Sequence, residues 1–182
     1  MHWMVAPHNG SVTDGGLRAA AAVAAGLAFA SAAVTAYWTF GGTALLDTVG
    51  GYPEELARTR ATPAVLVGLL VIAVKSVGGV IALVLAKPSG NRIRRRVVVV
   101  AAAVGSAVLT VYGGLLVAVG ALVLTGVLEP DGPVDRRALS WHVLLWDMWF
   151  LLWGLSLAVA TWASVHLARP PARRGAADRV RS

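Results

Sequence analysis

Residues 63–86 read PAVLVGLLVIAVKSVGGVIALVLA, and this stretch decides the fold class of the chain. It holds a single charged side chain, Lys75. A helix of about 20 residues covers the roughly 30 Å of hydrocarbon in a bilayer. The apolar residues run on continuously instead of alternating with polar ones, which excludes a strand of a membrane β-barrel. We therefore predict that residues 63–86 form a transmembrane helix.

Three further runs have the same character, at residues 17–40, 97–123 and 141–167. Together the four runs predict an all-α integral membrane protein, a four-helix transmembrane bundle over residues 17–168. A flexible tail, 1–16, is expected before it and a basic tail, 169–182, after it. The alternative for the first run is a signal peptide ending at Ala30, but the apolar residues continue to Phe40 and no basic segment precedes them, which favours a span.

Composition excludes a water-soluble protein. Hydrophobic residues make up 57% of the 182-residue chain and charged residues 14%, whereas about 25% of a soluble domain is charged. The chain has no cysteine, which excludes disulfides and thiolate metal sites. The net charge of +7 comes from arginines that flank the apolar runs, such as 94–96 and those after residue 168. This position predicts contact with the lipid bilayer and its anionic headgroups and argues against nucleic acid as a partner.

The distribution of cations predicts the orientation. Eleven arginines and lysines lie at the start of the first run, in the middle loop and in the C-terminal tail, whereas four lie in the other two loops. Because cytoplasmic loops carry the excess of cations, both termini are expected in the cytoplasm. Fourteen of the sixteen cations are arginine, which indicates a GC-rich bacterial genome. The expected location is therefore the plasma membrane, that is, the inner membrane of a bacterium.

Polar residues inside the runs are the candidate site. Lys75 lies near the bilayer centre, on a stripe of small residues that predicts close approach of another helix. Asp147 is expected to face inward as well, with Trp146, Trp149 and Trp153 turned away from its side. At a similar depth, Tyr37 and Tyr112 complete a possible cluster of Lys75, Asp147, Tyr37 and Tyr112. Two interpretations stay open: a buried ion pair that fixes helix register, and a site for a ligand, ion or proton.

No cofactor or catalytic site is predicted. His142 and His166 share one helix and no other run holds a histidine, which argues against haem held within the bundle. No run is expected to offer two carboxylates, or a histidine and a carboxylate at helical ligand spacing on one face, so no metal site is predicted. No nucleophile motif is present, and the glycine pairs lack the context of a phosphate loop and mark close packing or a bend. We therefore expect a protein that is not an enzyme.

The first outer loop predicts a short surface helix. Its residues 52–60, YPEELARTR, have proline and acids at the start and bases at the end, which matches the helix dipole.

Two stretches carry a family resemblance: AYWTFGGTALLD at residues 36–47 and LWDMWFLLWG at residues 145–154. They resemble the small bacterial four-helix membrane proteins of domain-of-unknown-function family 3995. The family has no established activity, so the resemblance implies the four-span layout and no chemistry. It draws attention to outer-interface residues, namely Trp38, Gly41, Gly42, Asp47, Trp146, Asp147 and Trp149.

Two functions remain as hypotheses. The first is a non-enzymatic accessory or structural component of the plasma membrane, with a membrane-protein partner or a second copy of itself. The second is a small permease or ion-coupled carrier that uses Lys75 and Asp147. A membrane enzyme is disfavoured because no catalytic constellation is present.

Overall fold

The computed structural model describes residues 10–87 and 91–167, so residues 1–9 of the first predicted tail and all of the predicted tail 169–182 lie outside the described residues. Residues 10–16, which were expected in the flexible tail, belong to helix α1 instead. Within these two ranges the chain is helical and contains no strand. The elements in chain order are α1 (Gly10–Thr39), η1 (Leu46–Thr48), α2 (Gly51–Thr59), α3 (Thr62–Leu85), α4 (Arg92–Leu124), α5 (Arg136–Trp141), η2 (His142–Trp146) and α6 (Asp147–Leu167). α5, η2 and α6 follow one another without interruption, and η2 is a turn of π-helix.

Four helices are long and apolar enough to cross a membrane. They comprise residues 14–39 of α1, all of α3, all of α4, and residues 136–166 of the α5–η2–α6 helix. These ranges agree with the predicted spans at 17–40, 63–86, 97–123 and 141–167. The short helix predicted at 52–60 is also confirmed, as α2.

Local sequence explains where the helices begin. Pro63 lies in the first turn of α3, where its missing N–H group has no helical partner to lose. Asn91 precedes α4, and its side chain accepts hydrogen bonds from the backbone N–H groups of Ile93 and Arg94. Asp135 caps α5 in the same way.

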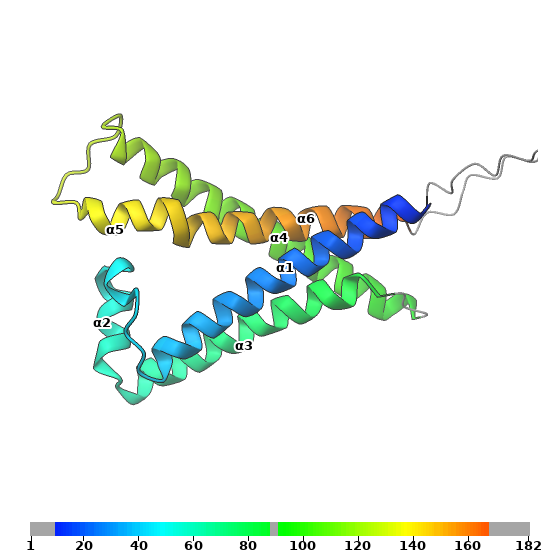
Figure 1. Ribbon diagram of the computed structural model, residues 1–182, viewed down its shortest axis with the longest axis horizontal. Coiled ribbons are helices and arrows are strands. Elements are labelled where there is room, and N and C mark those ends of the chain that lie inside the picture. The colour runs from blue at the N-terminus through cyan, green and yellow to red at the C-terminus, as the bar shows by residue number, and fades with distance from the viewer. Residues whose placement is uncertain (1–9, 88–90, 168–182) are drawn as a thin grey trace, which may run out of the picture.

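The four long helices form two pairs, α1 with α3 and α4 with α6, and α1 also packs against α6. The pairs lie close together at the end where α1 begins and spread apart toward the end that carries α2 and α5 (Figure 1). We call the latter the α2 end. The start of α1, the end of α3, the start of α4 and the end of α6 all lie at the opposite end (Figure 1).

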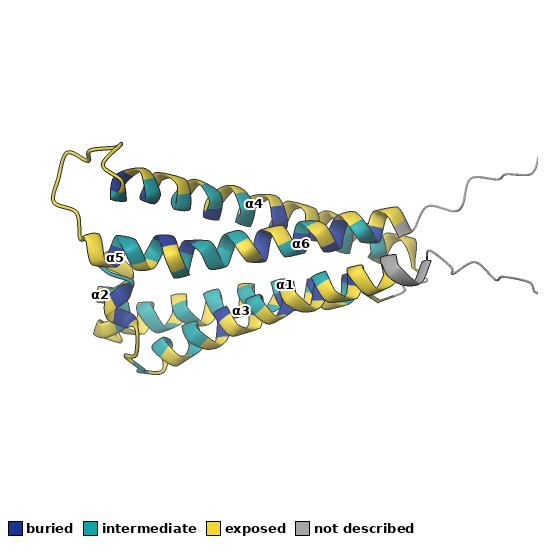
Figure 2. Ribbon diagram, turned by 45° about the horizontal axis from the view of Figure 1, so that its top comes forward, coloured by how far each residue is buried: buried dark blue, intermediate teal, exposed yellow. Residues whose placement is uncertain are grey.

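Small residues form the contact between the pairs. The core consists largely of alanines from α1, together with residues of the other three long helices: Ala21, Ala24, Ala25, Ala28, Ala82, Ala102, Trp153, Leu157 and Ala160. Large apolar side chains lie on the outside instead, for example Leu70 and Val74 of α3, which are 64% and 63% exposed. Figure 2 shows exposed residues along the outer faces of the long helices. This distribution is the one expected where lipid surrounds the protein.

Glycines bring the backbones of α4 and α6 together. A Cβ atom added at Gly113 would lie 2.5 Å from the backbone nitrogen of Leu151 and 2.9 Å from the carbonyl oxygen of Asp147. One added at Gly154 would lie 2.6 Å from the backbone nitrogen of Thr110. Paired glycines were expected to mark either close packing or a bend. At Gly113 the role is close packing, and α4 runs unbroken from Arg92 to Leu124.

Trp146, Trp149 and Trp153 were expected to turn away from the Asp147 side, which was taken as the one inward face of the last run, but the structure packs them inside the protein as well. Trp153 is 5% exposed, and Trp146 and Trp149 are partly buried and hydrogen-bonded to other elements. The reason is that α6 packs against α4 on one side and α1 on another, so that it buries two faces. The prediction assumed one inward-facing stripe, whereas α6 packs both against its partner α4 and against α1 of the other pair.

Candidate functional site

A cavity of about 440 Å³ lies between the two helix pairs, toward the α2 end where they spread. α1, α3, α4 and the η2–α6 segment all contribute to its walls, and the loop before α2 together with the first turn of α2 closes it at one side. Its lining residues are Ser31, Val34, Thr35, Trp38, Val49, Pro53, Val71, Lys75, Tyr112, His142, Trp146, Asp147, Trp149 and Phe150.

Lys75 contacts α1 and α6 across this cavity. Its Nζ donates to the Thr35 hydroxyl at 2.9 Å and lies 3.5 Å from the Ser31 carbonyl oxygen. It also lies 5.5 Å from the centre of the Phe150 ring, within the range of a cation–π contact. The helix positions that flank Lys75 are small, and the close neighbours of Gly68 and Gly79 are side chains of α1. The inward orientation of Lys75 is therefore present in the structure.

A π-turn brings His142 and Asp147 together. In an α-helix, residues five apart point about 140° away from each other, because each residue turns by about 100°. The π-turn closes a hydrogen bond from the Asp147 N–H to the His142 carbonyl oxygen, so these two residues lie on the same face. Nδ1 of His142 lies 3.3 Å from the Asp147 carboxylate, and Nε2 lies 2.8 Å from the Val49 carbonyl oxygen. Asp147 itself is buried, at 6% exposed.

This geometry corrects one expectation. A histidine and a carboxylate on one face of a run were expected to be missing, yet His142 and Asp147 form such a pair. The expectation failed because it assumed α-helical geometry throughout. Among the described residues, however, no group of three histidines, cysteines or acids is placed to hold a metal ion.

Hydrogen bonds from indole nitrogens hold the aromatic wall in place. Trp146 donates to the hydroxyl of Thr48 at 3.1 Å, and Trp149 donates to the Leu27 carbonyl oxygen at 3.0 Å. Trp38 packs edge-on against Trp146, with ring centres 5.2 Å apart. These contacts tie α1, η1 and α6 together around the cavity.

The structure brings together three of the four residues in the predicted cluster. Lys75, Asp147 and Tyr112 line the cavity, and the Tyr112 ring packs against Phe150 at 5.9 Å between centres. Tyr37 does not line it: half exposed, it lies against Gly42 and accepts a hydrogen bond from the Ala44 N–H at 3.4 Å. Among the described residues, no carboxylate oxygen lies within 4 Å of the Lys75 ammonium, so Lys75 and Asp147 share the cavity without forming a direct ion pair.

Sequence reasoning missed His142, Thr35 and Phe150 as members of the site. His142 was considered as a haem ligand and set aside. Thr35 and Phe150 occupy ordinary positions in apolar runs, and only the packing of α1 against α3 and α6 brings them to Lys75.

A second cavity, of about 220 Å³, lies between α1, α2 and α3. Its one ionisable lining residue is Arg60, and that guanidinium already donates to the Gly41 carbonyl oxygen at 2.8 Å. Gly41 has a φ of 102°, which glycine adopts without strain, and a side chain there would meet the guanidinium. This cavity is largely apolar, and its arginine supports the loop between α1 and α2.

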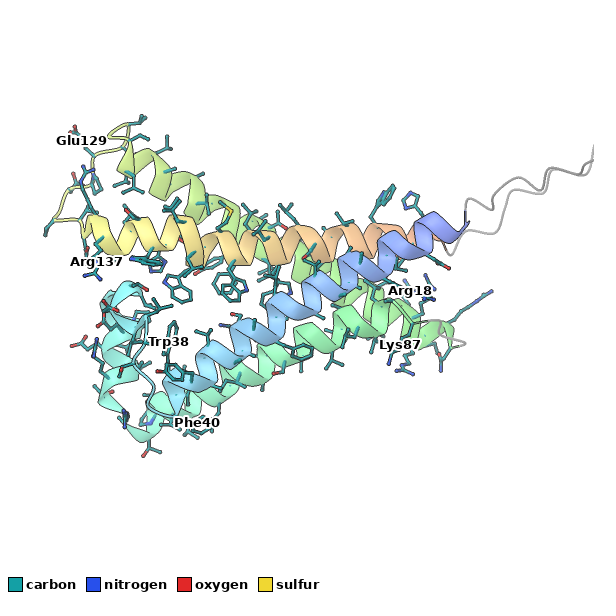
Figure 3. The ribbon with its side chains drawn as sticks, viewed as in Figure 1. Arg18, Trp38, Phe40, Lys87, Glu129 and Arg137 are labelled. Atoms are coloured by element: carbon teal, nitrogen blue, oxygen red, sulfur yellow. The ribbon has the colours of Figure 1, made fainter. Side chains whose placement is uncertain are left out.

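The two sequence stretches with the family resemblance contact each other in space. Trp38 of the first lies against Trp146 of the second, and Figure 3 shows Trp38 on α1 at the α2 end, with Arg137 of α5 beyond it. Asp47 of the first stretch forms an ion pair of 3.2 Å with Arg137, just before the second stretch. The stretches therefore build one structural unit, which closes the cavity at the α2 end.

The fold and the cavity together define the class: an all-helical protein with four helices long and apolar enough to cross a membrane. The chain belongs to the family described as Protein of unknown function (DUF3995), whose pattern matches residues 28–157. The match includes both stretches that carry the resemblance and confirms that prediction. No curated protein and no solved structure matches the chain.

Proposed function

We propose that this chain is a non-enzymatic, four-span protein of the bacterial plasma membrane that binds a small solute in the cavity at the α2 end, as a small carrier or permease does. The observation that carries the proposal is the cavity itself. It collects Lys75 from α3 and His142 and Asp147 from the η2–α6 segment, and an ionisable side chain within a membrane span is costly unless it has a use or a partner. A cavity of about 440 Å³ is in the usual range for small-molecule sites.

The proposed orientation puts the α2 end outside the cell and both termini in the cytoplasm. Arg18 and Lys87 lie at the opposite end of the protein from Glu129 and Arg137 (Figure 3), and the excess of cations belongs to the end with Arg18 and Lys87. The solute would then enter from the outer side.

Anionic lipid headgroups are proposed partners at the cytoplasmic end. Arg94 and Arg96, in the first turns of α4, are exposed and available to phosphate groups. Arg95 differs, because its guanidinium donates to the Ser164 carbonyl oxygen of α6 and so joins the two helices.

A second candidate function is a purely structural or accessory role, alone or with a membrane-protein partner or a second copy. One observation favours it: the polar groups of the cavity already have partners within the chain. Lys75 bonds Thr35, His142 contacts Asp147, and Trp149 bonds Leu27. Such a network fixes helix register without any ligand.

Solute transport by reconstituted protein separates the two candidates. Sealed vesicles that contain the purified protein are loaded with candidate solutes. The rate of solute release is compared with that from loaded vesicles without protein and from loaded vesicles that contain the Lys75→Gln variant. The carrier proposal predicts release that depends on Lys75. If vesicles with either the variant or the unmodified protein release every solute no faster than vesicles without protein, the result supports the structural role.

A further inference from the structure

The charges in the cavity at the α2 end do not cancel, and this determines which ligand fits. We infer that the cavity selects a small organic anion, a carboxylate joined to an apolar body, with the carboxylate on Lys75. The inference rests on the proposed binding function and specifies the chemical class of its ligand.

The pair formed by His142 and Asp147 carries no net charge. Nε2 of His142 faces the Val49 carbonyl oxygen, which only accepts hydrogen bonds, so this nitrogen carries a proton. In a neutral imidazole Nδ1 would then be bare and would face the Asp147 carboxylate, which also only accepts. One further proton is needed between them. Whether it sits on the ring or on the carboxyl group, the pair is neutral overall.

Lys75 therefore supplies the remaining charge. Its Nζ has neutral oxygen acceptors, the Thr35 hydroxyl and the Ser31 carbonyl, and the face of the Phe150 ring. Of the residues that line the cavity, Lys75, His142 and Asp147 are the ones whose side chains can carry a charge at neutral pH. The sum over the three is one positive charge in surroundings of low polarity, which an anion would compensate.

The walls determine the rest of the ligand. Aromatic rings from three helices surround the space beside Lys75: Trp38, Tyr112, Trp146, Trp149 and Phe150. Rings of this kind bind flat or aliphatic apolar groups and leave the few polar groups to fix the orientation. An inorganic anion would leave this surface unused, whereas a carboxylate with an apolar body would occupy both parts.

Three probes of the same size and different charge test the inference. 3-Phenylpropionate is negative, 3-phenylpropanamide is neutral and 3-phenylpropylamine is positive. Binding to the full chain in mild detergent is measured by calorimetry and by tryptophan fluorescence, with protein-free micelles as the blank. We expect 3-phenylpropionate to bind about tenfold more tightly than the amide, since the Lys75 ammonium attracts a carboxylate more strongly than the neutral oxygen of an amide, and the amine to bind weakest.

Variants at the two lysines of the chain locate the charge. Lys75→Gln is expected to remove the preference for the anion, and Lys75→Arg to retain it. Lys87→Gln, the matched control outside the cavity, is expected to bind as the unmodified protein does. Because the comparison of the three probes is made on the unmodified protein, it does not depend on the folding of any variant.

The outcomes distinguish the two levels of the proposal. If the amine or the amide binds as tightly as the acid, or if folded Lys75→Gln keeps the preference, the cavity binds ligands but the inferred anion selectivity is wrong. If none of the three probes binds above the blank, the proposed binding function fails together with the inference. Preference for the acid that disappears in Lys75→Gln and survives in Lys87→Gln supports both.

Discussion

Nδ1 of His142 lies 3.3 Å from the carboxylate of Asp147, five residues further along the same helix, because the turn between them is a π-turn. Lys75 has its own partner in Thr35, at 2.9 Å. The buried carboxylate and the partly buried ammonium are thus stabilised by different neighbours, although both line one cavity.

Double-mutant cycles can measure this division of partners. We expect His142→Gln and Asp147→Asn to be coupled by about 0.5–3 kcal/mol in the free energy of unfolding, as for residues in direct contact. The cycle of Lys75→Gln with Asp147→Asn is expected to show a smaller coupling, because the two side chains share the cavity without direct contact. Unfolding in a series of mixed dodecyl sulfate micelles provides the free energies. A coupling of Asp147 to Lys75 that exceeds its coupling to His142 would contradict the assignment.

Neighbouring glycines of α4 provide a matched test of helix packing. Gly113→Ala is expected to destabilise the protein by about 1–3 kcal/mol, because the new Cβ atom would press on the backbone of α6 at Leu151. Gly114→Ala is expected to be neutral or stabilising by up to about 1 kcal/mol, since its Cβ atom would make an ordinary 3.7 Å contact and alanine favours helix. Both are measured as shifts of the unfolding midpoint. Equal effects at the two positions would show that α4 and α6 do not cross at Gly113.

The hydroxyl of Thr48 supports the closed α2 end of the cavity. Thr48→Val removes the acceptor of the Trp146 N–H and is expected to cost about 1 kcal/mol, because it leaves a partly buried donor unpaired. Thr59→Val is the control. The hydroxyls of Thr48 and Thr59 each donate to the carbonyl oxygen three residues earlier, but Thr59 is exposed on α2. A loss for Thr48→Val no larger than that for Thr59→Val would remove Thr48 from the unit that closes the cavity.

The positions of the long helices follow from the sequence because lipid imposes a simple rule. A helix that crosses hydrocarbon needs a continuous apolar run, and the chain has four such runs, each of which forms one of the long helices. The short helix α2 could also be predicted from the sequence, because Pro53 and the acids after it lie at its start and Arg58 near its end, as the helix dipole favours. The inward orientation of Lys75 followed from the energetic cost of exposing a charge to lipid.

The remaining features of the site depend on contacts that no single helix encodes. The π-turn at residues 142–146 changes which side chains share a face, and a periodicity of 100° per residue misplaces His142 relative to Asp147. The tryptophans of α6 were misplaced because this helix packs against both α1 and α4. Tyr37 lies at a depth that suits the cluster, but its ring covers Gly42 in the loop after α1.

We propose that four helices cross the plasma membrane with the α2 end outside and both termini in the cytoplasm. The chain has no cysteine, so one introduced residue gives an unambiguous label. Gly132→Cys places a thiol in the exposed loop before α5, and Lys87→Cys places one at the other end of the protein. In intact cells or spheroplasts, a membrane-impermeant maleimide is predicted to label Cys at 132 at once and Cys at 87 only after permeabilisation. Labelling of position 87 from outside, or recovery of the protein in the soluble fraction without detergent, would contradict this four-span arrangement.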